Sequence, residues 1–518
     1  MLDVLIRNAR IVDGSGNPGY KGDLAVQQDR IADIGRFPNA QAELVIDAAG
    51  KVLCPGFIDA HSHSELEMLA GRHTAGVQMG VTTEFTGPDG FSFAPLPPQR
   101  LTEYRRYLYG VYGDADVGWD WRTCAEYLQR FKGQVYNNIV PQVPHGAVRL
   151  AVKGWAAGRA NDAELEAMRR LTRECMETGA VGFNTGLDYV PTAHADLREL
   201  VELSKVVAAY GGVYATHMRG YGPAERETAI AETVAIAEQA DIGVHISHFF
   251  GDSQVYASAE AARARGIDIT WDGYSYMAGC TTLAFVLPRT LQTKNVSAFL
   301  KELEGPGMRR AARVSLEERL PEDGPAYFAS LSQPHNKWME GERVRAVWRR
   351  SGKPFEDFVY DLLIDEALAP VLVYPWVGEP EENEARLRHT LTHPLHMVIT
   401  DGIYGGGYPN PRGWGTYPRI LGRYVREKGW LRMEDAIRRM TGFPAMRFGL
   451  DDRGLLRRGM AADLVIFDPR TVRDRATFEK PRLPPVGIEH VFVNGVPVVD
   501  QGRLTSRRPG RLLRLHGE

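Results

Sequence analysis

The sequence lacks any hydrophobic run that approaches the ~20 residues of a membrane-spanning helix. It also lacks an excess of charge of one sign, because the net charge is -3 over 518 residues. A hydrophobic content of 44% and a charged content of 25% are ordinary for a globular protein. The chain opens on a strand pattern with no basic segment before it. We therefore expect a small-molecule enzyme without nucleic-acid or membrane partners.

Cysteine is scarce. The chain has four cysteines without C-x-x-C spacing, namely Cys54, Cys124, Cys175 and Cys280. This pattern argues against a disulfide framework or a zinc ribbon. It favours a reducing compartment, and we expect a cytoplasmic protein.

Histidines and one aspartate stand at the ends of short apolar runs. His61 and His63 close the run that starts at Pro55, and on an extended strand side chains at i and i+2 point the same way. Two later runs end in His217 and His248, and a fourth ends in Asp401. A barrel enzyme builds a metal site from such strand ends, so these residues predict one.

The two ends of the chain carry β patterns, and the middle alternates strands with helices. In residues 1–54 the pattern predicts strands at Val4–Ile6, Ala9–Val12, Leu24–Gln27, Arg30–Ile34 and Leu44–Ile46. Residues 445–518 contain similar runs at Asp463–Phe467 and His490–Val499. We expect both ends to pair into one small β-sandwich.

The middle region, residues 55–444, predicts a (β/α)8 TIM barrel of the α/β class. Its eight candidate strands are Phe57–Asp59, Val81–Phe85, Asn138–Val143, Val181–Phe183, Val213–Thr216, Gly243–Ser247, Ile267–Trp271 and Met397–Thr400. Helices are predicted at Ala163–Thr178, after a cap signal at Asn161-Asp162, and at Glu225–Ala240. Residues 289–380 exceed a normal connection and predict an inserted lid or subdomain, with a helix at Phe355–Ala367.

Several motifs, in this order, resemble the D-aminoacylase (N-acyl-D-amino-acid deacylase) branch of the amidohydrolase superfamily. They are PGFIDAHSH at 55–63, GVTT at 80–83, GPDGFSFAPL at 87–96, GAVGFNTGLDYVP at 179–191, YGGVYATHMR at 210–219, VHISH at 244–248, DGYSYMAGCTTL at 272–283, TDG at 400–402, PRGWGTYPRILGRYVRE at 411–427 and the C-terminal RGLLRRGMAADLVIFDP. The resemblance runs nearly end to end. It implies a metal-dependent barrel enzyme that hydrolyses C–N bonds of acylated amino acids.

The resemblance also implies roles for individual residues. His217 and His248 correspond to ligands of a tightly held zinc, and His61 and His63 to ligands of a second or weaker metal position. Asp401 corresponds to the catalytic aspartate, which takes a proton from water and returns it to the amine. It also belongs to the expected ligand set. His245 points away from His248 on the same strand, and we interpret it as structural.

Asp89 departs from the family pattern, which has cysteine in this loop. A carboxylate can also bind or bridge metals, and it favours zinc, manganese or iron. The strand region 181–186 has no lysine, which other amidohydrolase branches use as a bridging ligand when carbamylated. We therefore predict that Asp89 is a ligand, with an Asx-type turn before Gly90 as the alternative. One or two zinc ions are expected, with Mn²⁺ or Fe²⁺ as alternatives.

The substrate-binding residues match the family only in part. Arg412, Tyr189 and Tyr274 match its carboxylate-binding residues. The family's lysine and serine are replaced here by Phe250 and Cys280, and Asn410 stands in place of a histidine. Loss of the ammonium group predicts weaker binding of a carboxylate and a bulkier, less anionic substrate. Core packing by Phe250 and a structural ion pair of Arg412 are the alternatives.

The leading hypothesis is a metal-dependent amidohydrolase acting on an N-acyl amino acid or a related amide. A cyclic-amide hydrolase of the hydantoinase or dihydroorotase kind and a catalytically silent scaffold are the alternatives. The acyl group, the amine, the stereochemistry, the metal count and the oligomeric state, a homo-oligomer included, stay open.

Overall fold

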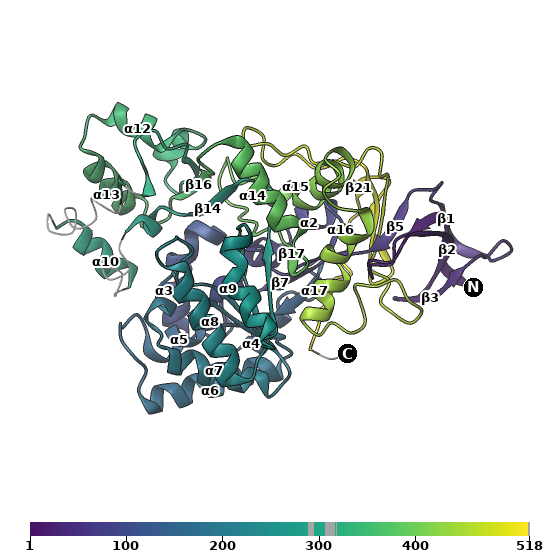
Figure 1. Ribbon diagram of the computed structural model, residues 1–518. Coiled ribbons are helices and arrows are strands. Elements are labelled where there is room, and N and C mark those ends of the chain that lie inside the picture. The colour runs from purple at the N-terminus through teal and green to yellow at the C-terminus, as the bar shows by residue number, and fades with distance from the viewer. Residues whose placement is uncertain (288–294, 306–315, 318, 516–518) are drawn as a thin grey trace.

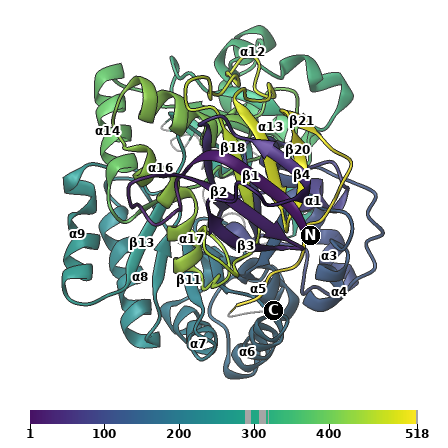
Figure 2. The same cartoon turned by 90° about the vertical axis from the view of Figure 1, so that its right-hand side faces the viewer.

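The computed structural model describes residues 1–287, 295–305, 316–317 and 319–515. Strands from both ends of the chain form one nine-stranded sheet, at the right of Figure 1 and facing the viewer in Figure 2. Its strands are β1 (Leu2–Ile11), β2 (Tyr20–Gln27), β3 (Arg30–Gly35), β4 (Ala42–Asp47), β5 (Val52–Pro55), β18 (Leu464–Phe467), β19 (Ile488–Val493), β20 (Val496–Asp500) and β21 (Arg503–Leu504). The two ends meet where β5 pairs antiparallel with β18.

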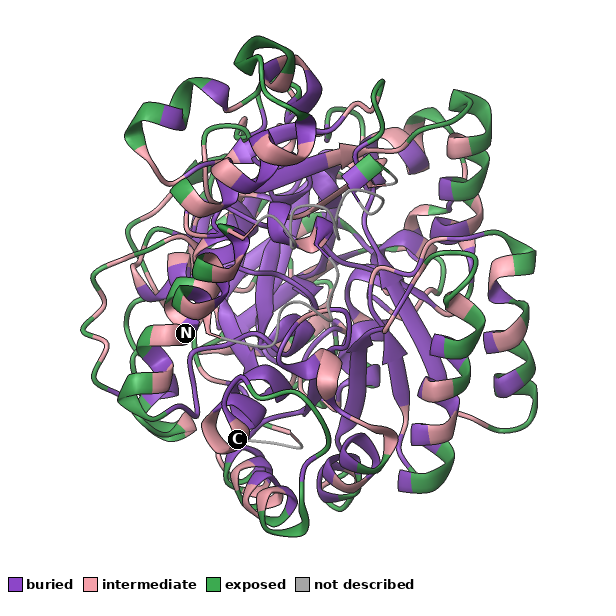
Figure 3. Cartoon of the chain, turned by 90° about the vertical axis from the view of Figure 1, so that its left-hand side faces the viewer, coloured by how far each residue is buried: buried purple, intermediate pink, exposed green. Residues whose placement is uncertain are grey.

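Two parallel sheets fill the middle of the molecule. One has six strands, β9 (Val143–Pro144), β10 (Gly182–Gly186), β11 (Val213–His217), β12 (Val244–Ile246), β13 (Ile269–Gly273) and β17 (His396–Val398). The other has three, β6 (Phe57–Asp59), β7 (Val81–Thr86) and β8 (Asn138–Pro141). Their strands are buried and helices cover them from outside, as Figure 3 shows. The chain therefore has an α/β fold.

The helices that accompany these strands are short to medium in length. They are α1 (Glu65–Leu69), α2 (Ala75–Gln78), α3 (Pro98–Tyr112), α4 (Cys124–Gln129), α5 (His145–Lys153), α6 (Asp162–Glu177), α7 (Leu197–Ala208), α8 (Arg226–Ala240), α9 (Ser253–Ala264), α14 (Pro380–Thr392), α15 (Arg412–Arg419), α16 (Met433–Met440) and α17 (Gly442–Arg447). Single turns of 3-10 helix are η1 (Pro88–Gly90), η2 (Thr192–His194) and η3 (Leu283–Val286), and α15 continues as a π-helix, η6 (Ile420–Glu427).

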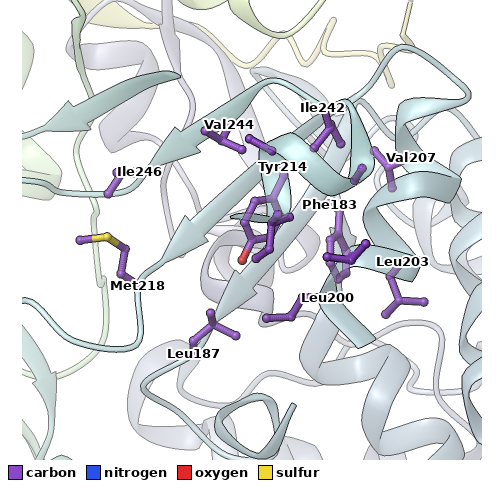
Figure 4. Packing of buried hydrophobic residues seen from close by; sticks show 14 of the residues in the cluster. Phe183, Leu187, Leu200, Leu203, Val207, Tyr214, Met218, Ile242, Val244 and Ile246 are labelled. Carbon is purple, nitrogen blue, oxygen red and sulfur yellow. The ribbon is translucent and has the colours of Figure 1, made fainter. Parts of the chain in front are cut away.

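Packing between strands and outer helices explains why these segments fold as they do. Phe183 and Tyr214 on adjacent strands meet Leu200, Leu203 and Val207 of α7 (Figure 4). All five side chains are fully buried or nearly so, and burying such a side chain contributes about 1.5–3 kcal/mol. The apolar stripe of α7 therefore fixes the helix against the parallel sheet and aligns the strand ends.

The predicted helices agree closely with the structure. The cap signal is confirmed as a capping box, because Asn161 Oδ1 accepts from Glu164 N at 2.9 Å and Glu164 Oε2 accepts from Asn161 N at 2.9 Å. The helix predicted at Phe355–Ala367 ends earlier, at Asp365. Ala367 and Leu368 have φ values of 51° and 71°, which a right-handed helix cannot include.

Two strand predictions needed correction. The two N-terminal strands expected at 4–6 and 9–12 are one strand, β1, whose register shifts between Ile6 and Ala9. Asn8 absorbs the extra residue with a φ of 55°. The single strand expected at 138–143 is instead two strands, β8 and β9, which pair with different neighbours.

The cysteine prediction was also wrong in part. Cys124 at the start of α4 and Cys175 in α6 form a disulfide, with Cα atoms 5.7 Å apart, whereas Cys54 and Cys280 are free. The pair is 51 residues apart in sequence, so only the packing of α4 on α6 brings the thiols together. No helix in the described part of the chain is long and apolar enough to cross a membrane.

The region predicted as an insertion, residues 289–380, has its own small sheet and core. Residues 289–294, 306–315 and 318 of it lie outside the described residues. The rest contains α10 (Val296–Leu303), β15 (Tyr327–Ser330), η5 (Pro334–Met339), α12 (Val344–Ser351), α13 (Phe355–Asp365) and β16 (Val371–Pro375), and β16 pairs with both β15 and β14 (Ala278–Thr282). These helices lie away from the nine-stranded sheet in Figure 1.

Candidate metal centre

The six residues predicted as metal ligands converge at the carboxyl ends of the central strands. His61 and His63 follow β6, Asp89 lies in η1 after β7, and His217 ends β11. His248 and Asp401 lie two and three residues beyond β12 and β17. Parallel strands place their carboxyl ends on the same side of a sheet, so residues far apart in the sequence meet here.

Asp89 lies between the histidines. Its Oδ1 is 3.5 Å from His61 Nε2 and 3.8 Å from both His217 Nδ1 and His248 Nε2. Its Oδ2 is 3.5 Å from His63 Nε2. The two oxygens of one carboxylate thus face different histidines.

Asp401 approaches the site from the end of β17, the strand next to β6. Its Oδ1 is 3.5 Å from His61 Nε2 and 3.4 Å from His63 Nε2. Its Oδ2 forms an ion pair with Arg412 Nη2 at 2.8 Å. One oxygen therefore faces the histidines while the other is held by the guanidinium group.

The donor atoms fit a divalent cation. Two groups have ligand atoms that all lie within 4.8 Å of one another, His61 with Asp89 and His248, and His61 with His63 and Asp401. His61 Nε2 and Asp89 Oδ1 are buried and make no hydrogen bond. Buried polar atoms are normally satisfied, and imidazole nitrogens with carboxylate oxygens are the donors that zinc accepts.

Burial and neighbouring charges shift the pKa values of the titratable groups at the site in different directions. Burial lowers the pKa of His217 to about 3, which keeps this imidazole neutral and able to ligate. Burial by itself would lower the pKa of His63 as well. Hydrogen bonds with Asp401 and Asp89 outweigh it and raise the pKa of His63 to about 9. Burial opposes ionisation of Asp401, yet Arg412 and His63 lower the pKa of Asp401 to about 2.

A cavity of about 470 Å³ opens onto these residues. Of the predicted substrate-binding residues, Tyr189, Tyr274, Cys280 and Arg412 line it. The Tyr189 ring lies 4.8 Å from that of His217, and the Tyr274 ring lies 4.2 Å from the Arg412 guanidinium carbon. Aromatic and apolar side chains form much of the remaining wall, including Phe91, Tyr107, Leu108, Val111 and Phe285.

Phe250 is the predicted substrate-binding residue that the structure sets apart. It is not among the residues that line the cavity. Its ring packs 4.8 Å from Tyr274 and 5.1 Å from Trp376. Asn410 is likewise set back from the cavity, where its Nδ2 donates to Ala278 O at 3.0 Å and its Oδ1 accepts from Arg412 N at 3.2 Å. Direct substrate contact by Phe250 stays a prediction.

Sequence reasoning missed three residues of the site. Asp188 Oδ2 lies 3.7 Å from His217 Nε2, and the Tyr221 ring lies 5.0 Å from that of His217. Arg319, from the inserted region, lines the cavity beside Phe285. Asp188 follows a strand end, as the predicted ligands do, so that signal was available. Arg319 had no signal, because nothing in the sequence links the insertion to the strand ends.

Gly186 explains how the loop of Asp89 reaches the histidines. A Cβ atom added at Gly186 would collide with the carbonyl oxygen of Asp89 and lie 2.9 Å from Tyr189 Cδ2. Only glycine permits this approach of backbone to backbone. The glycine at the end of β10 therefore leaves room for the Asp89 loop.

Comparison with known proteins gives a consistent result. The model of the amidohydrolase family matches residues 44–265 and 361–499. D-aminoacylase of Alcaligenes xylosoxydans xylosoxydans is 35% identical, with 99% of this chain and 97% of that protein covered. N-acyl-D-glutamate deacylase of the same organism is 33% identical, with 99% and 96% covered.

Solved structures agree with these relatives. The N-acyl-D-glutamate deacylase of Bordetella bronchiseptica, complexed with zinc and a phosphonate inhibitor, has a TM-score of 0.82 at 30% identity, with 99% of both chains covered. An L-hydantoinase of Arthrobacter aurescens has a TM-score of 0.59 at 17% identity, with 99% of both chains covered, and this likeness concerns the fold alone. The chain therefore belongs to the amidohydrolase family, in the branch that contains the D-aminoacylases.

Proposed function

We propose that this chain is a metal-dependent amidohydrolase that cleaves the C–N bond of an N-acyl amino acid or a related amide. The observation that carries the proposal is the meeting of four histidines and two aspartates beside the cavity, with His61 Nε2, His217 Nε2 and Asp89 Oδ1 buried and without a hydrogen bond. The D-aminoacylase and N-acyl-D-glutamate deacylase relatives support the reaction class. A silent scaffold would not need to retain this complete donor set.

Two neighbouring sets of residues would hold the metal. His217, His248 and Asp89 would hold one ion, and His61, His63 and Asp401 the other. Asp89 lies between the two sets, because its Oδ2 is 3.5 Å from His63 Nε2. We propose zinc, in one or two ions, with Mn²⁺ or Fe²⁺ as alternatives. When bound, such a cation polarises a carbonyl and lowers the pKa of water.

Asp401 would move the proton. Its carboxylate is ionised at neutral pH, since its pKa lies at about 2. In the proposed reaction, the attacking water forms a bond to the acyl carbon and loses a proton to Asp401. The C–N bond then breaks, and Asp401 returns the proton to the amine leaving group.

The substrate would lie along the aromatic cavity. Arg412 is fully buried and forms an ion pair with Asp401. Its guanidinium group has further N–H donors, and these would bind an anionic group of the substrate. Tyr189 and Tyr274 would flank the scissile group, and Cys280 would close the wall near Arg412. These roles rest on the placement of the four side chains around one cavity.

The (β/α)8 barrel belongs to this proposal as well. Hydrogen bonds join the two parallel sheets at both edges, from Asp401 N to His61 O at 2.8 Å and from Val181 N, just before β10, to Pro141 O of β8 at 2.9 Å. These bonds support a closed ring of strands.

A homo-oligomeric state stays a prediction. A cytoplasmic location also stays a prediction. It rests on the low cysteine content, and the Cys124–Cys175 disulfide weakens that argument.

The test of the reaction class is a hydrolysis screen on metal-quantified protein. The panel contains N-acyl-D-amino acids, their L enantiomers, aryl amides and cyclic imides. We expect hydrolysis of at least one linear N-acyl substrate and a strong preference for one enantiomer. Activity confined to the cyclic imides would replace the proposal with a hydantoinase-like function, and a metal-loaded protein inactive on every class would support the scaffold.

Phe250→Lys tests how far the missing ammonium group determines the substrate. The new ammonium would lie beside Tyr274, whose ring covers Arg412. A charge-assisted hydrogen bond contributes about 1.5–3 kcal/mol, so kcat/KM for an N-acyl-D-amino acid should rise about tenfold or more relative to an aryl amide. Phe250→Met is the matched apolar control. An unchanged ratio would show that Phe250 only packs against Tyr274.

A further inference from the structure

Three residues of the proposed metal site have left-handed backbone conformations. The φ angles are 55° at Asp89, 35° at His248 and 48° at Asp401. Residues with a side chain rarely adopt this region, and it persists only where the surroundings hold it. Each of these segments contacts a different buried carboxyl group.

Glu65 holds the loop that carries Asp89. It is fully buried as the first residue of α1, two residues after His63. Its Oε1 accepts from Gly87 N, before Asp89, and its Oε2 accepts from Ser92 Oγ, after it, at 2.9 Å. Tyr127 Oη donates to the same Oε2 at 2.7 Å. Glu65 thus brackets the Asp89 loop and ties it to the segment of His61 and His63.

Asp272 holds the segment that carries His248. It lies buried in β13, and its Oδ1 accepts a hydrogen bond from the backbone N of His248 itself. Its Oδ2 is 2.8 Å from His245 Nε2. The other ring nitrogen of His245 is 2.8 Å from Thr270 Oγ1. His245, interpreted from the sequence as structural, therefore holds the Asp272 carboxylate in place. That carboxylate in turn holds the backbone of His248.

Asp59 connects the segments of His61 and Asp401. Its Oδ1 accepts from Thr400 N at 3.0 Å and from His61 N at 3.3 Å, and its Oδ2 accepts from Thr400 Oγ1 at 2.5 Å. Asp59 is 1% exposed, so water does not replace these bonds. One carboxyl group thereby holds the ends of two neighbouring strands, β6 and β17, each of which leads into a proposed ligand.

We propose that Asp59, Glu65 and Asp272 are positioning residues that hold the three left-handed segments, so that the ligands of the metal site are in place before the metal binds. Each does so by accepting hydrogen bonds from the backbone of a ligand residue or from backbone and hydroxyl groups near one, without contacting the ligand side chains. This inference rests on the proposed metal site. It predicts that the three carboxyl groups contribute to metal affinity beyond their contribution to folding.

The experiment measures the affinity of metal-free protein for Zn²⁺ alone, by competition with a chelating dye. The variants are Asp59→Asn, Glu65→Gln and Asp272→Asn, which keep the side-chain shape but replace one acceptor oxygen with an amide donor. We expect a loss of about 10–100-fold in zinc affinity for each variant, the range typical of groups that support metal ligands. Thermal unfolding shows whether each variant is folded.

Glu366→Gln is the matched control. Glu366 is fully buried and accepts from Ser332 Oγ at 2.6 Å, Gln333 N at 3.1 Å and Asn336 Nδ2 at 2.7 Å, all within the inserted region. It supports a loop as Glu65 does, but none of its partners is a proposed ligand. Its substitution should lower the unfolding temperature and leave zinc affinity unchanged.

The outcomes separate this inference from the proposed function. If wild-type protein binds no zinc, the proposed function fails and this inference fails with it. If wild type binds zinc and folded variants bind it equally well, only the positioning role is overturned. If Glu65→Gln does not fold, Tyr127→Phe is the alternative variant, because it removes one donor to Glu65 and keeps the carboxyl group. A smaller loss of zinc affinity would support the positioning role. Wild-type zinc affinity would contradict it.

Discussion

Asp401→Asn should lower kcat at least ~100-fold on any amide that the wild-type enzyme cleaves, because it removes the proposed general base. The substitution keeps the shape of the side chain, and asparagine also tolerates the left-handed φ of 48° at this position. The thermal unfolding temperature should therefore stay close to that of wild type. Steady-state kinetics at substrate saturation measure the loss.

Asp241→Asn is the matched control for this prediction. Asp241 also has a left-handed backbone, with a φ of 50°, but it lies exposed at the end of α8. Its substitution should leave kcat unchanged. A folded Asp401→Asn variant with near-normal turnover would show that another residue accepts the proton, and Asp188, beside His217, would be the next candidate.

The core of the candidate site could be predicted because the candidate ligands follow directly after apolar, strand-like runs. His61, His217 and His248 each follow a run of apolar residues, and a parallel sheet gathers such positions on one side. Asp89 was predictable only through the family motif around it. Its own signal, an aspartate before glycine, is equally typical of a turn.

The rest of the site depends on contacts between segments far apart in the sequence. The replacement of lysine by Phe250 is visible in the motif, but its side chain packs behind Tyr274, and only the fold decides that orientation. Cys124 and Cys175 pair through helix packing that has no local pattern. Arg319 enters the cavity from a separate small domain-like region with its own core. Sequence spacing carries no information about any of these three contacts.

His217→Ala should remove both bound metal and activity. His217 is buried and its pKa is lowered to about 3, so the ring is neutral and available as a ligand at physiological pH. Its Nδ1 lies at hydrogen-bond distance, 3.0 Å, from His248 Nε2, and both nitrogens lie 3.8 Å from Asp89 Oδ1. A shared cation explains why both nitrogens face Asp89 Oδ1.

Elemental analysis of the purified protein measures this prediction directly. Wild type should contain at least one transition-metal ion per chain, and His217→Ala should contain less, with hydrolysis lost in proportion. His335→Ala is the control, because His335 lies exposed in the inserted region beside Asp365 and should not change metal content. Active wild-type protein without stoichiometric metal would contradict the prediction. The close approach of His217 to His248 would then require one ring to donate a hydrogen bond to the other, and catalysis would rest on Asp401 and Arg412 without a cation.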